Sequence, residues 1–285
     1  MPNATAVRTH RADEREYVLG THAEESVRLG FQHRLWSASA HALWERAVVA
    51  PGQTVLDAGC GPGHASMDLA QIVGPTGRVL CVDESAGYLH QVSEQARSRR
   101  LENVDRILGD VQELESLLIN WHAKVDVAYA RWVLCFVPRP EKVIEGLSRL
   151  IAPGGRVAIQ DYFNYETMSL APKREEFSTV IRAVGKSFRD HGGDPDIAGR
   201  LPGMLHRNGF EVTHISVNQR IARPTDQIWH WPDSFWSVYV PRLVKSGHIT
   251  QTQADEFVTV WRSASESRDS FMFLPPVVDI IAVRK

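Results

Sequence analysis

The stretch Val55–His64, VLDAGCGPGH, carries the strongest structural signal in this chain. Its apolar start predicts the end of a buried strand that Asp57 closes, and the residues after it have the pattern of a helix. Gly59, Gly61 and Gly63 turn the chain between the two elements. A strand, a glycine turn and a helix bring backbone N–H groups and a helix N-terminus to face a ligand. Several classes of ligand use this geometry.

Strands alternate with helices downstream of this loop. Apolar runs that predict parallel strands lie at 78–83, 104–110, 124–131 and 156–163, with helical patterns between them. Alternation at this spacing predicts βαβ units and a doubly wound, Rossmann-like α/β sheet. Two later stretches are expected to complete the same sheet: residues 210–221, of mixed polarity, and residues 277–285, which are mostly apolar.

The chain divides into three predicted parts. Residues 1–50 form an N-terminal helical arm, residues 51–163 form the α/β core, and residues 164–285 complete the sheet and carry inserted helices. The insert before the last strand is rich in aromatic residues at helical spacing: Trp229, Trp231, Phe235, Trp236 and Tyr239. These side chains either line a pocket as a lid or form the core of a helical subdomain or a dimer contact.

Composition narrows the classes of function. The 285 residues carry a formal net charge of −2, which gives no general attraction to nucleic acid or anionic membranes. No apolar run approaches the ~20 residues that span a bilayer. Cys60, Cys81 and Cys135 are scattered without CxxC spacing, so we expect neither a disulfide framework nor a zinc site. A reducing cytoplasm is the predicted location.

The glycine spacing argues against the two commonest phosphate-binding loops. A dinucleotide-binding GxGxxG pattern needs its third glycine at His64 or at Ser66, and neither residue is glycine. A P-loop needs GxxxxGK[ST], and no lysine follows these glycines. Phosphate binding is therefore the weaker interpretation of this loop.

The loop instead resembles motif I of class I S-adenosylmethionine (SAM) dependent methyltransferases, an apolar run followed by (D/E)-x-G-x-G-x-G. Further elements of that family follow in order: Asp83 closes the second strand, Gly109-Asp110 follows the third, VDVAYA forms the fourth, and IAPGG precedes the fifth. The resemblance covers residues 55–158. It implies a seven-stranded Rossmann-like sheet and SAM as the cofactor.

The resemblance implies roles for the loop and for two acids. The backbone of Gly59, Gly61 and Gly63 is expected to approach the methionine and ribose portions of SAM without a Cβ in the way. Asp83 is expected to accept from both ribose hydroxyls, and Asp57 to lie near the SAM amino group or to order the loop. As an alternative, strand-end carboxylates are often solvated or cap the next helix.

Five further residues are expected around the cofactor. By the same resemblance, Asp110 bonds the adenine amino group with the backbone of Val111 beside it, although Asp110 equally suits a helix cap. Arg131 meets the SAM carboxylate or an acidic acceptor, or else forms a surface salt bridge. The arm resembles the helical cap that folds over SAM in such enzymes, which places Tyr17 and Gln32 at the cofactor.

Binding of the acceptor has little sequence signature, because methyl transfer mainly needs an acceptor that is held in line with the S–CH3 bond and a site from which water is excluded. Asp161 and Tyr162 end the fifth strand at the carboxyl edge of the sheet and are the predicted acceptor-contacting pair. His33 is a candidate base for an acidic acceptor, and His191 ranks after it. Trp36 is expected to pack the arm on the core.

Motifs of other methyltransferase classes are missing. YARWV replaces the [DNS]PP[YF] of DNA amino-methylating enzymes, and Ala130-Arg131 stands where metal-dependent, catechol-type members carry aspartate, so no metal is expected. The sequence therefore predicts a metal-independent methyltransferase of the ubiquinone/menaquinone-type or natural-product branch, acting on O, N or C of a small organic acceptor. No nucleic acid or membrane partner is expected, and the chain is a monomer or a homodimer. A SAM-binding protein without catalysis and an RNA methyltransferase remain as alternatives.

Overall fold

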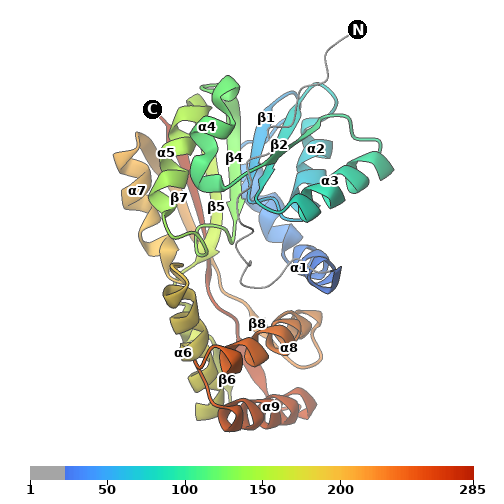
Figure 1. Ribbon diagram of the computed structural model, residues 1–285, viewed down its shortest axis with the longest axis vertical. Coiled ribbons are helices and arrows are strands. Elements are labelled where there is room, and N and C mark those ends of the chain that lie inside the picture. The colour runs from blue at the N-terminus through green and yellow to red at the C-terminus, as the bar shows by residue number, and fades with distance from the viewer. Residues whose placement is uncertain (1–22) are drawn as a thin grey trace.

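A seven-stranded sheet in the order β3-β2-β1-β4-β5-β10-β7 forms the centre of the computed structural model, which describes residues 23–285 (Figure 1). The strands are β1 (Thr54–Ala58), β2 (Arg78–Asp83), β3 (Val104–Leu108), β4 (Val125–Arg131), β5 (Ile151–Tyr162), β7 (Phe210–Asn218) and β10 (Val277–Arg284). The strands β1 to β5 pair in parallel, and β10 pairs antiparallel with β5 and β7. The predicted doubly wound sheet, completed by two late strands, is confirmed.

Helices cover both faces of this sheet. One face carries α1 (Ala23–Arg46), α2 (His64–Val73) and α3 (Ala86–Ser98), and the other carries α4 (Leu114–Leu117), α5 (Pro140–Leu150) and α7 (Leu201–Arg207) (Figure 1). Successive strand residues alternate between the two cores, as Val55 and Leu56 do. No helix within residues 23–285 is long and apolar enough to cross a membrane.

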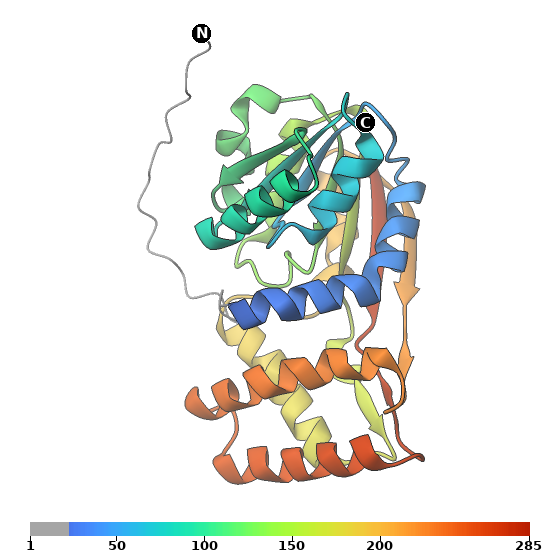
Figure 2. The ribbon, with the colours of Figure 1, turned by 90° about the vertical axis from the view of Figure 1, so that its right-hand side faces the viewer.

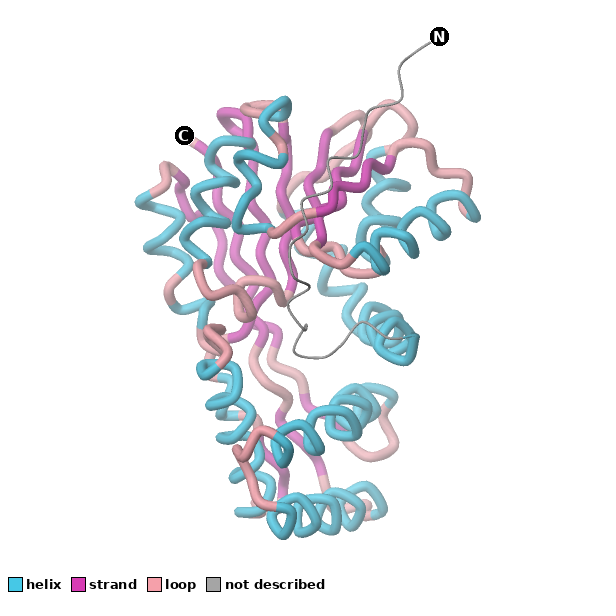
Figure 3. Tube along the Cα trace, viewed as in Figure 1, coloured by secondary structure: helices cyan, strands magenta, loops and turns pink. Residues whose placement is uncertain are grey.

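A smaller unit continues from the carboxyl ends of the strands. It contains a three-stranded sheet, in the order β6-β9-β8, and three long helices (Figure 3). Its elements are β6 (Ser169–Ala171), α6 (Glu175–Asp190), β8 (Ile221–Ala222), α8 (His230–Lys245), α9 (Gln251–Glu266) and β9 (Phe271–Phe273). The small sheet was not predicted, because strands of two or three residues are too short to show a periodic pattern.

The first half of α1 lies between the sheet and α8 (Figure 2). Gly30 does not interrupt this helix, which is continuous over 24 residues. A Cβ at Gly30 would lie 3.1 Å from Nε2 of His64, so the glycine lets the arm approach the first turn of α2 closely. The arm therefore covers the edge at which the parallel strands end.

A buried polar bridge joins three central strands. The hydroxyl of Tyr129 on β4 donates to Oε1 of Gln160 on β5 at 3.0 Å, and Nε2 of Gln160 donates to Oδ1 of Asp279 on β10 at 2.8 Å. All three side chains are buried. Gln160 thus satisfies polar groups that the apolar core cannot satisfy.

Replacing Gln160 by leucine is expected to remove one hydrogen bond from Tyr129 and one from Asp279. We expect the free energy of unfolding to fall by about 2–4 kcal/mol, because each buried, unsatisfied polar group costs about 1–3 kcal/mol. Urea denaturation measures the change, and the exposed substitution Gln71→Leu on α2 is the control. A Gln160→Leu variant as stable as its control would show that the bridge contributes nothing.

Candidate functional site

A cavity of about 910 Å³ lies at the carboxyl ends of β1 to β5, bounded on its other side by α1 and α8. This is the switch point of the sheet, where the chain leaves β1 for neighbours on opposite sides. One part, here called the glycine-loop half, is bordered by the turns after β1, β2 and β3. The aromatic half is bordered by Trp132, Phe136, Tyr162, Tyr165, Phe188, Trp231, Phe235 and Trp236.

The turn after β1 depends on glycine. Gly59, Gly61 and Gly63 have φ angles of 72°, 54° and 86°, in the left-handed region that favours glycine. A Cβ at Gly59 would lie 2.5 Å from the side chain of Val133, whereas a Cβ at Gly61 would meet nothing within 4 Å. Gly59 and Gly61 line the cavity, but Gly63 instead caps α2. The loop therefore presents backbone to the cavity at two of the three predicted positions.

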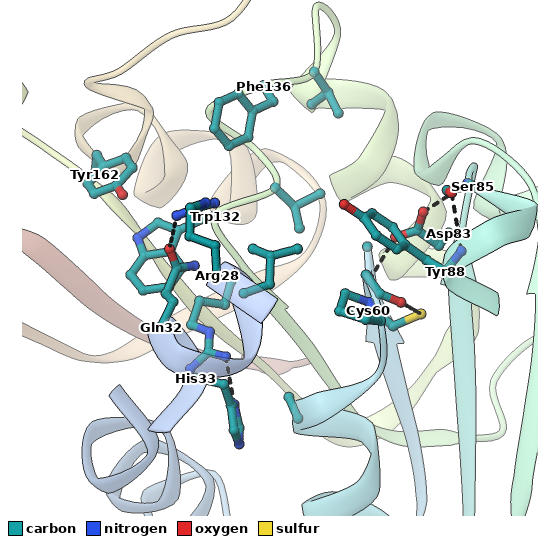
Figure 4. Close-up of a pocket in the computed structure, with 18 of the residues that line it drawn as sticks. Arg28, Gln32, His33, Cys60, Asp83, Ser85, Tyr88, Trp132, Phe136 and Tyr162 are labelled. Atoms are coloured by element: carbon teal, nitrogen blue, oxygen red, sulfur yellow. Dashed lines mark hydrogen bonds between the residues drawn. The ribbon is translucent and has the colours of Figure 1, made fainter. Parts of the chain in front are cut away.

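Asp83 closes the glycine loop from the next strand. Its Oδ2 accepts from the amide of Gly61 at 2.8 Å, and its Oδ1 accepts from the amide of Ser85 at 2.9 Å (Figure 4). Burial raises the pKa of Asp83, and these two bonds oppose the rise. A carboxylate has about four acceptor positions, so two stay available for donors in the cavity. The arrangement suits a ligand with two neighbouring hydroxyls.

Asp110 serves the capping role that the sequence left open. Its Oδ1 accepts from the amide of Gln112 at 2.8 Å and caps the 3₁₀ turn Val111–Glu113. Asp110 and Val111 both line the glycine-loop half as well. The cap holds the carboxylate at the cavity wall, so the structural role does not exclude a binding role.

Asp57 connects the end of β1 to the first turn of α2. Its Oδ2 accepts from the hydroxyl of Ser66 at 2.6 Å, and the residue also lines the cavity. Burial raises the pKa of Asp57 to about 6, although the Ser66 bond and the charge of Arg131 both lower it. Both predicted roles of Asp57 are therefore compatible with its position.

Arg131 and His33 bond to each other at the boundary between the halves. Nη2 of Arg131 lies 3.0 Å from Nδ1 of His33, and Nε2 of His33 lies 2.9 Å from Oδ2 of Asp68. A guanidinium only donates, so Nδ1 of His33 holds a lone pair and its proton sits on Nε2. The lone pair of Nδ1 accepts the hydrogen bond from Arg131, so it is not available as a base in this arrangement. This differs from the predicted role of His33 as a base for the acceptor. Arg131 is only partly exposed, and its hydrogen bond goes to His33 rather than to a surface carboxylate.

Asp161 does not lie where the sequence predicts it. Its carboxylate accepts from the amides of Cys135 at 3.2 Å and Tyr162 at 2.9 Å, its side chain is buried, and it is not part of the cavity wall. Neighbouring strand residues point to opposite faces, so only one member of the pair can face the ligand, and that member is Tyr162. Asp161 instead fastens the segment after β4. Tyr17 lies outside the described residues.

Trp132 is a wall residue that the sequence prediction missed. Its indole is stacked between two other aromatic rings. The ring centroid of Tyr162 lies 5.9 Å away with 24° between the planes, and that of Trp231 lies 5.7 Å away with 26° between the planes. Its φ of 51° is unusual for a bulky residue and turns the chain immediately after β4. An aromatic residue directly after the fourth strand, in YARWV, was the available signal.

The aromatic insert divides between the two predicted roles. Trp231, Phe235 and Trp236 line the cavity. Trp229 stacks on Trp261 at 4.6 Å and belongs to the core of the helical unit. The pocket and core interpretations are therefore both correct, each for part of the cluster.

Two side chains of α1 contact Trp231 in the wall of the aromatic half. Oε1 of Gln32 accepts from the indole N–H of Trp231 at 2.7 Å, and Trp36 packs edge-on against Trp231 with 1% of its surface exposed. The packing role predicted for Trp36 is confirmed. Figure 4 shows Gln32, with His33 beside it, on the side of the cavity opposite Asp83.

The charged groups of the cavity wall are unevenly distributed. Asp57, Asp83, Glu84 and Asp110 border the glycine-loop half, and the side chains with basic groups that border the aromatic half are Arg28, His191 and Arg242. No carboxylate from the described part of the chain lines the aromatic half. Arg28 forms a buried pair with Glu25, at 2.6 Å. The described wall of the aromatic half is therefore mainly apolar, with basic groups and without a carboxylate.

One ring nitrogen of His191 forms a hydrogen bond with the backbone. Its Nδ1 lies 2.6 Å from the carbonyl oxygen of Ser187. Because a carbonyl only accepts, Nδ1 carries the hydrogen, and Nε2 holds the lone pair of the neutral ring. Within residues 23–285, no cluster of three or more His, Cys, Asp or Glu side chains is arranged to hold a metal ion. Metal independence stays a prediction.

Asp161→Asn is expected to change stability in a pH-dependent way. Burial, opposed by hydrogen bonds, raises the pKa of Asp161 from 3.8 to about 6. The folded chain thus binds this proton more tightly than the unfolded chain, and the stability that the carboxyl contributes falls as the pH rises from about 4 to about 6. The wild-type free energy of unfolding, relative to that of the non-titrating variant, should fall by about 1–3 kcal/mol over this interval.

Urea denaturation at several pH values measures this difference, with the surface substitution Asp105→Asn as the control. A difference between wild type and Asp161→Asn that does not vary with pH would contradict the assignment.

Comparison with known proteins agrees with this geometry. Residues 50–197, just over half of the chain, match a family described as a methyltransferase domain. The chain is 36% identical over 170 residues to an arsenite methyltransferase of Halobacterium salinarum, a match that covers 60% of this chain and only 40% of that protein. It is 28% identical over 200 residues to a ubiquinone/menaquinone biosynthesis C-methyltransferase of Vibrio campbellii, covering 63% and 74%.

Solved structures share the fold. Geranyl diphosphate C-methyltransferase from Streptomyces coelicolor, in complex with Mg²⁺, geranyl-S-thiolodiphosphate and S-adenosyl-L-homocysteine, superposes with a TM-score of 0.56. The sequences are 18% identical, and the alignment covers 89% of this chain and 77% of that chain. The seven-stranded sheet and its flanking helices are thus an arrangement that a known methyltransferase also has.

Proposed function

This chain belongs to the class I SAM-dependent methyltransferases, and we propose that it transfers the methyl group of SAM to a small organic acceptor held in the aromatic half of the cavity. One observation carries the proposal. A single cavity joins a glycine loop with strand-end acids to an aromatic chamber, and Arg131 and Trp132 lie consecutively at the junction.

The residues of the glycine-loop half fit SAM. Asp83 keeps acceptor positions for the ribose hydroxyls, and Nη1 of Arg131 is buried without a hydrogen-bond partner among the described residues, which suits a carboxylate. In this proposal Asp110 and the backbone of Val111 contact the adenine, and Asp57 contacts the amino group. When bound, SAM supplies a methyl group on a positively charged sulfur.

Asp83→Asn is expected to weaken SAM binding about 10- to 100-fold, because a charged acceptor of the ribose hydroxyls is lost. Asparagine keeps an acceptor oxygen for only one of the two backbone amides, those of Gly61 and Ser85, so urea denaturation of the variant checks that the fold persists. Calorimetric titration with SAM and S-adenosylhomocysteine measures the affinity, and Asp105→Asn, on the neighbouring strand β3, is the matched control. Unchanged affinity would exclude the ribose role.

We propose that the acceptor has a flat or otherwise apolar body and an acidic hydroxyl. Stacked Trp132, Tyr162 and Trp231 suit a flat body, and the basic groups bordering this half suit an oxygen that becomes negative. His191 is the candidate base, since Nε2 holds the lone pair of its neutral ring and the residue is exposed.

In the proposed reaction, Nε2 of His191 accepts the hydroxyl proton of the acceptor and passes it to solvent. The electron pair on that oxygen, or on a carbon conjugated with it, would form the new bond to the methyl carbon that SAM supplies. The bond from methyl to sulfur would break, and its electron pair would stay on sulfur. Trp132 and Trp231 hold the acceptor and exclude water.

His191→Gln is expected to lower turnover of a phenolic acceptor by about 10²–10⁴-fold and to leave SAM affinity unchanged, because general-base catalysis contributes about that factor. The assay follows label transfer from methyl-labelled SAM to a panel of phenols, hydroxyquinones and aliphatic amines. The control is His248→Gln, since His248 stacks on His191 but is not part of the cavity wall. Equal turnover in both variants would remove His191 from the mechanism.

We infer a small-molecule partner, in the cytoplasm, rather than RNA. The aromatic half is covered by α1 and α8, which suits a small acceptor better than a polymer, and a reducing compartment suits three buried free thiols. Labelling of RNA by the purified chain would favour the RNA alternative. SAM binding without label transfer to any acceptor of the panel would favour a binding protein without catalysis.

A further inference from the structure

Three polar side chains from distant parts of the sequence form a chain of hydrogen bonds at the edge of the cavity. Asp68 comes from α2, His33 from the arm helix α1, and Arg131 from the end of β4. Oδ2 of Asp68 lies 2.9 Å from Nε2 of His33, and Nδ1 of His33 lies 3.0 Å from Nη2 of Arg131. Asp68 is not part of the cavity wall, so it acts on a ligand only through the other two.

Asp68 selects the tautomer that Arg131 needs. A carboxylate accepts the proton of Nε2, which leaves the lone pair of His33 on Nδ1, directed at a guanidinium that only donates. Within residues 23–285, His41 also lies 3.3 Å from the same carboxylate oxygen, and the ring of His64 is stacked on that of His33 at 5.9 Å. Burial lowers the pKa of His64 to about 4, so that ring stays neutral at ordinary pH.

Arg131 is held on two sides. Nη2 bonds to His33, and the guanidinium lies over the ring of Trp132 at 5.1 Å. Nη1 is buried and has no hydrogen-bond partner in the described part of the chain. A buried guanidinium nitrogen without a partner costs stability, and a ligand carboxylate removes that cost. These two contacts hold the guanidinium of a residue that lines the cavity.

We propose that Asp68 is a positioning residue for cofactor binding, which through His33 orients Arg131 toward the carboxylate of the methionine portion of SAM. This inference rests on the proposed function, because it requires SAM in the glycine-loop half. It also gives helix α1 a part in cofactor binding, because His33 bonds to Arg131.

The experiment compares two adenosyl ligands. S-adenosylhomocysteine contains the amino-acid portion, and 5′-methylthioadenosine lacks it. Asp68→Ala is expected to weaken S-adenosylhomocysteine binding about 5- to 20-fold, as for the loss of one oriented charged hydrogen bond, and to leave 5′-methylthioadenosine binding unchanged. Asp68→Asn keeps an acceptor for Nε2 and should recover most of the affinity. His41→Ala, which removes the other partner of Asp68, is the control.

A double-mutant cycle separates positioning from general destabilisation. In an Arg131→Gln background, Asp68→Ala should cause no further loss of S-adenosylhomocysteine affinity, because the group that it orients is gone. Additive losses, equal losses for both ligands, or wild-type affinity in Asp68→Ala would each overturn the inference. Failure of the wild-type chain to bind S-adenosylhomocysteine would overturn the proposed function itself, and wild-type binding that is insensitive to Asp68 overturns only the inference.

Discussion

A side chain at Gly59 would collide with Val133, so the turn after β1 and the segment after β4 pack together only because that residue is glycine. This contact sets the distance between the two loops that form the centre of the cavity. The amide of Gly61 then reaches Asp83, and Arg131 and Trp132 emerge beside the turn.

Burial alone does not identify the functional acids. Asp57 and Asp161 both have pKa values raised to about 6 by burial, and both bond to groups of the fold. Only Asp57 reaches the cavity. A raised pKa marks a carboxylate that the fold has taken out of water, and the direction of the side chain decides whether a ligand meets it.

The arm helix connects the two halves through consecutive residues. Gln32 accepts from Trp231 in the wall of the aromatic half, and His33 bonds to Arg131 at the boundary with the glycine-loop half. Because the two residues are adjacent, a movement of α1 affects both halves together. Gly30 lets α1 pack closely against His64 at the start of α2, and this contact positions the helix. The two halves of the cavity are thus connected through one element.

The sheet, the glycine turn and the positions of Asp57, Asp83 and Asp110 are predictable from the sequence, because they depend on local spacing and on the rule that parallel strands end at one edge. The direction of the Asp161 side chain, the partners of the two His33 nitrogens and the place of Trp132 in the cavity wall are visible only in the folded chain. The bonds of His33 join residues 35 and 98 positions away, and no periodic pattern in the chain records such pairs. Packing between distant elements sets these contacts, and spacing along the chain does not.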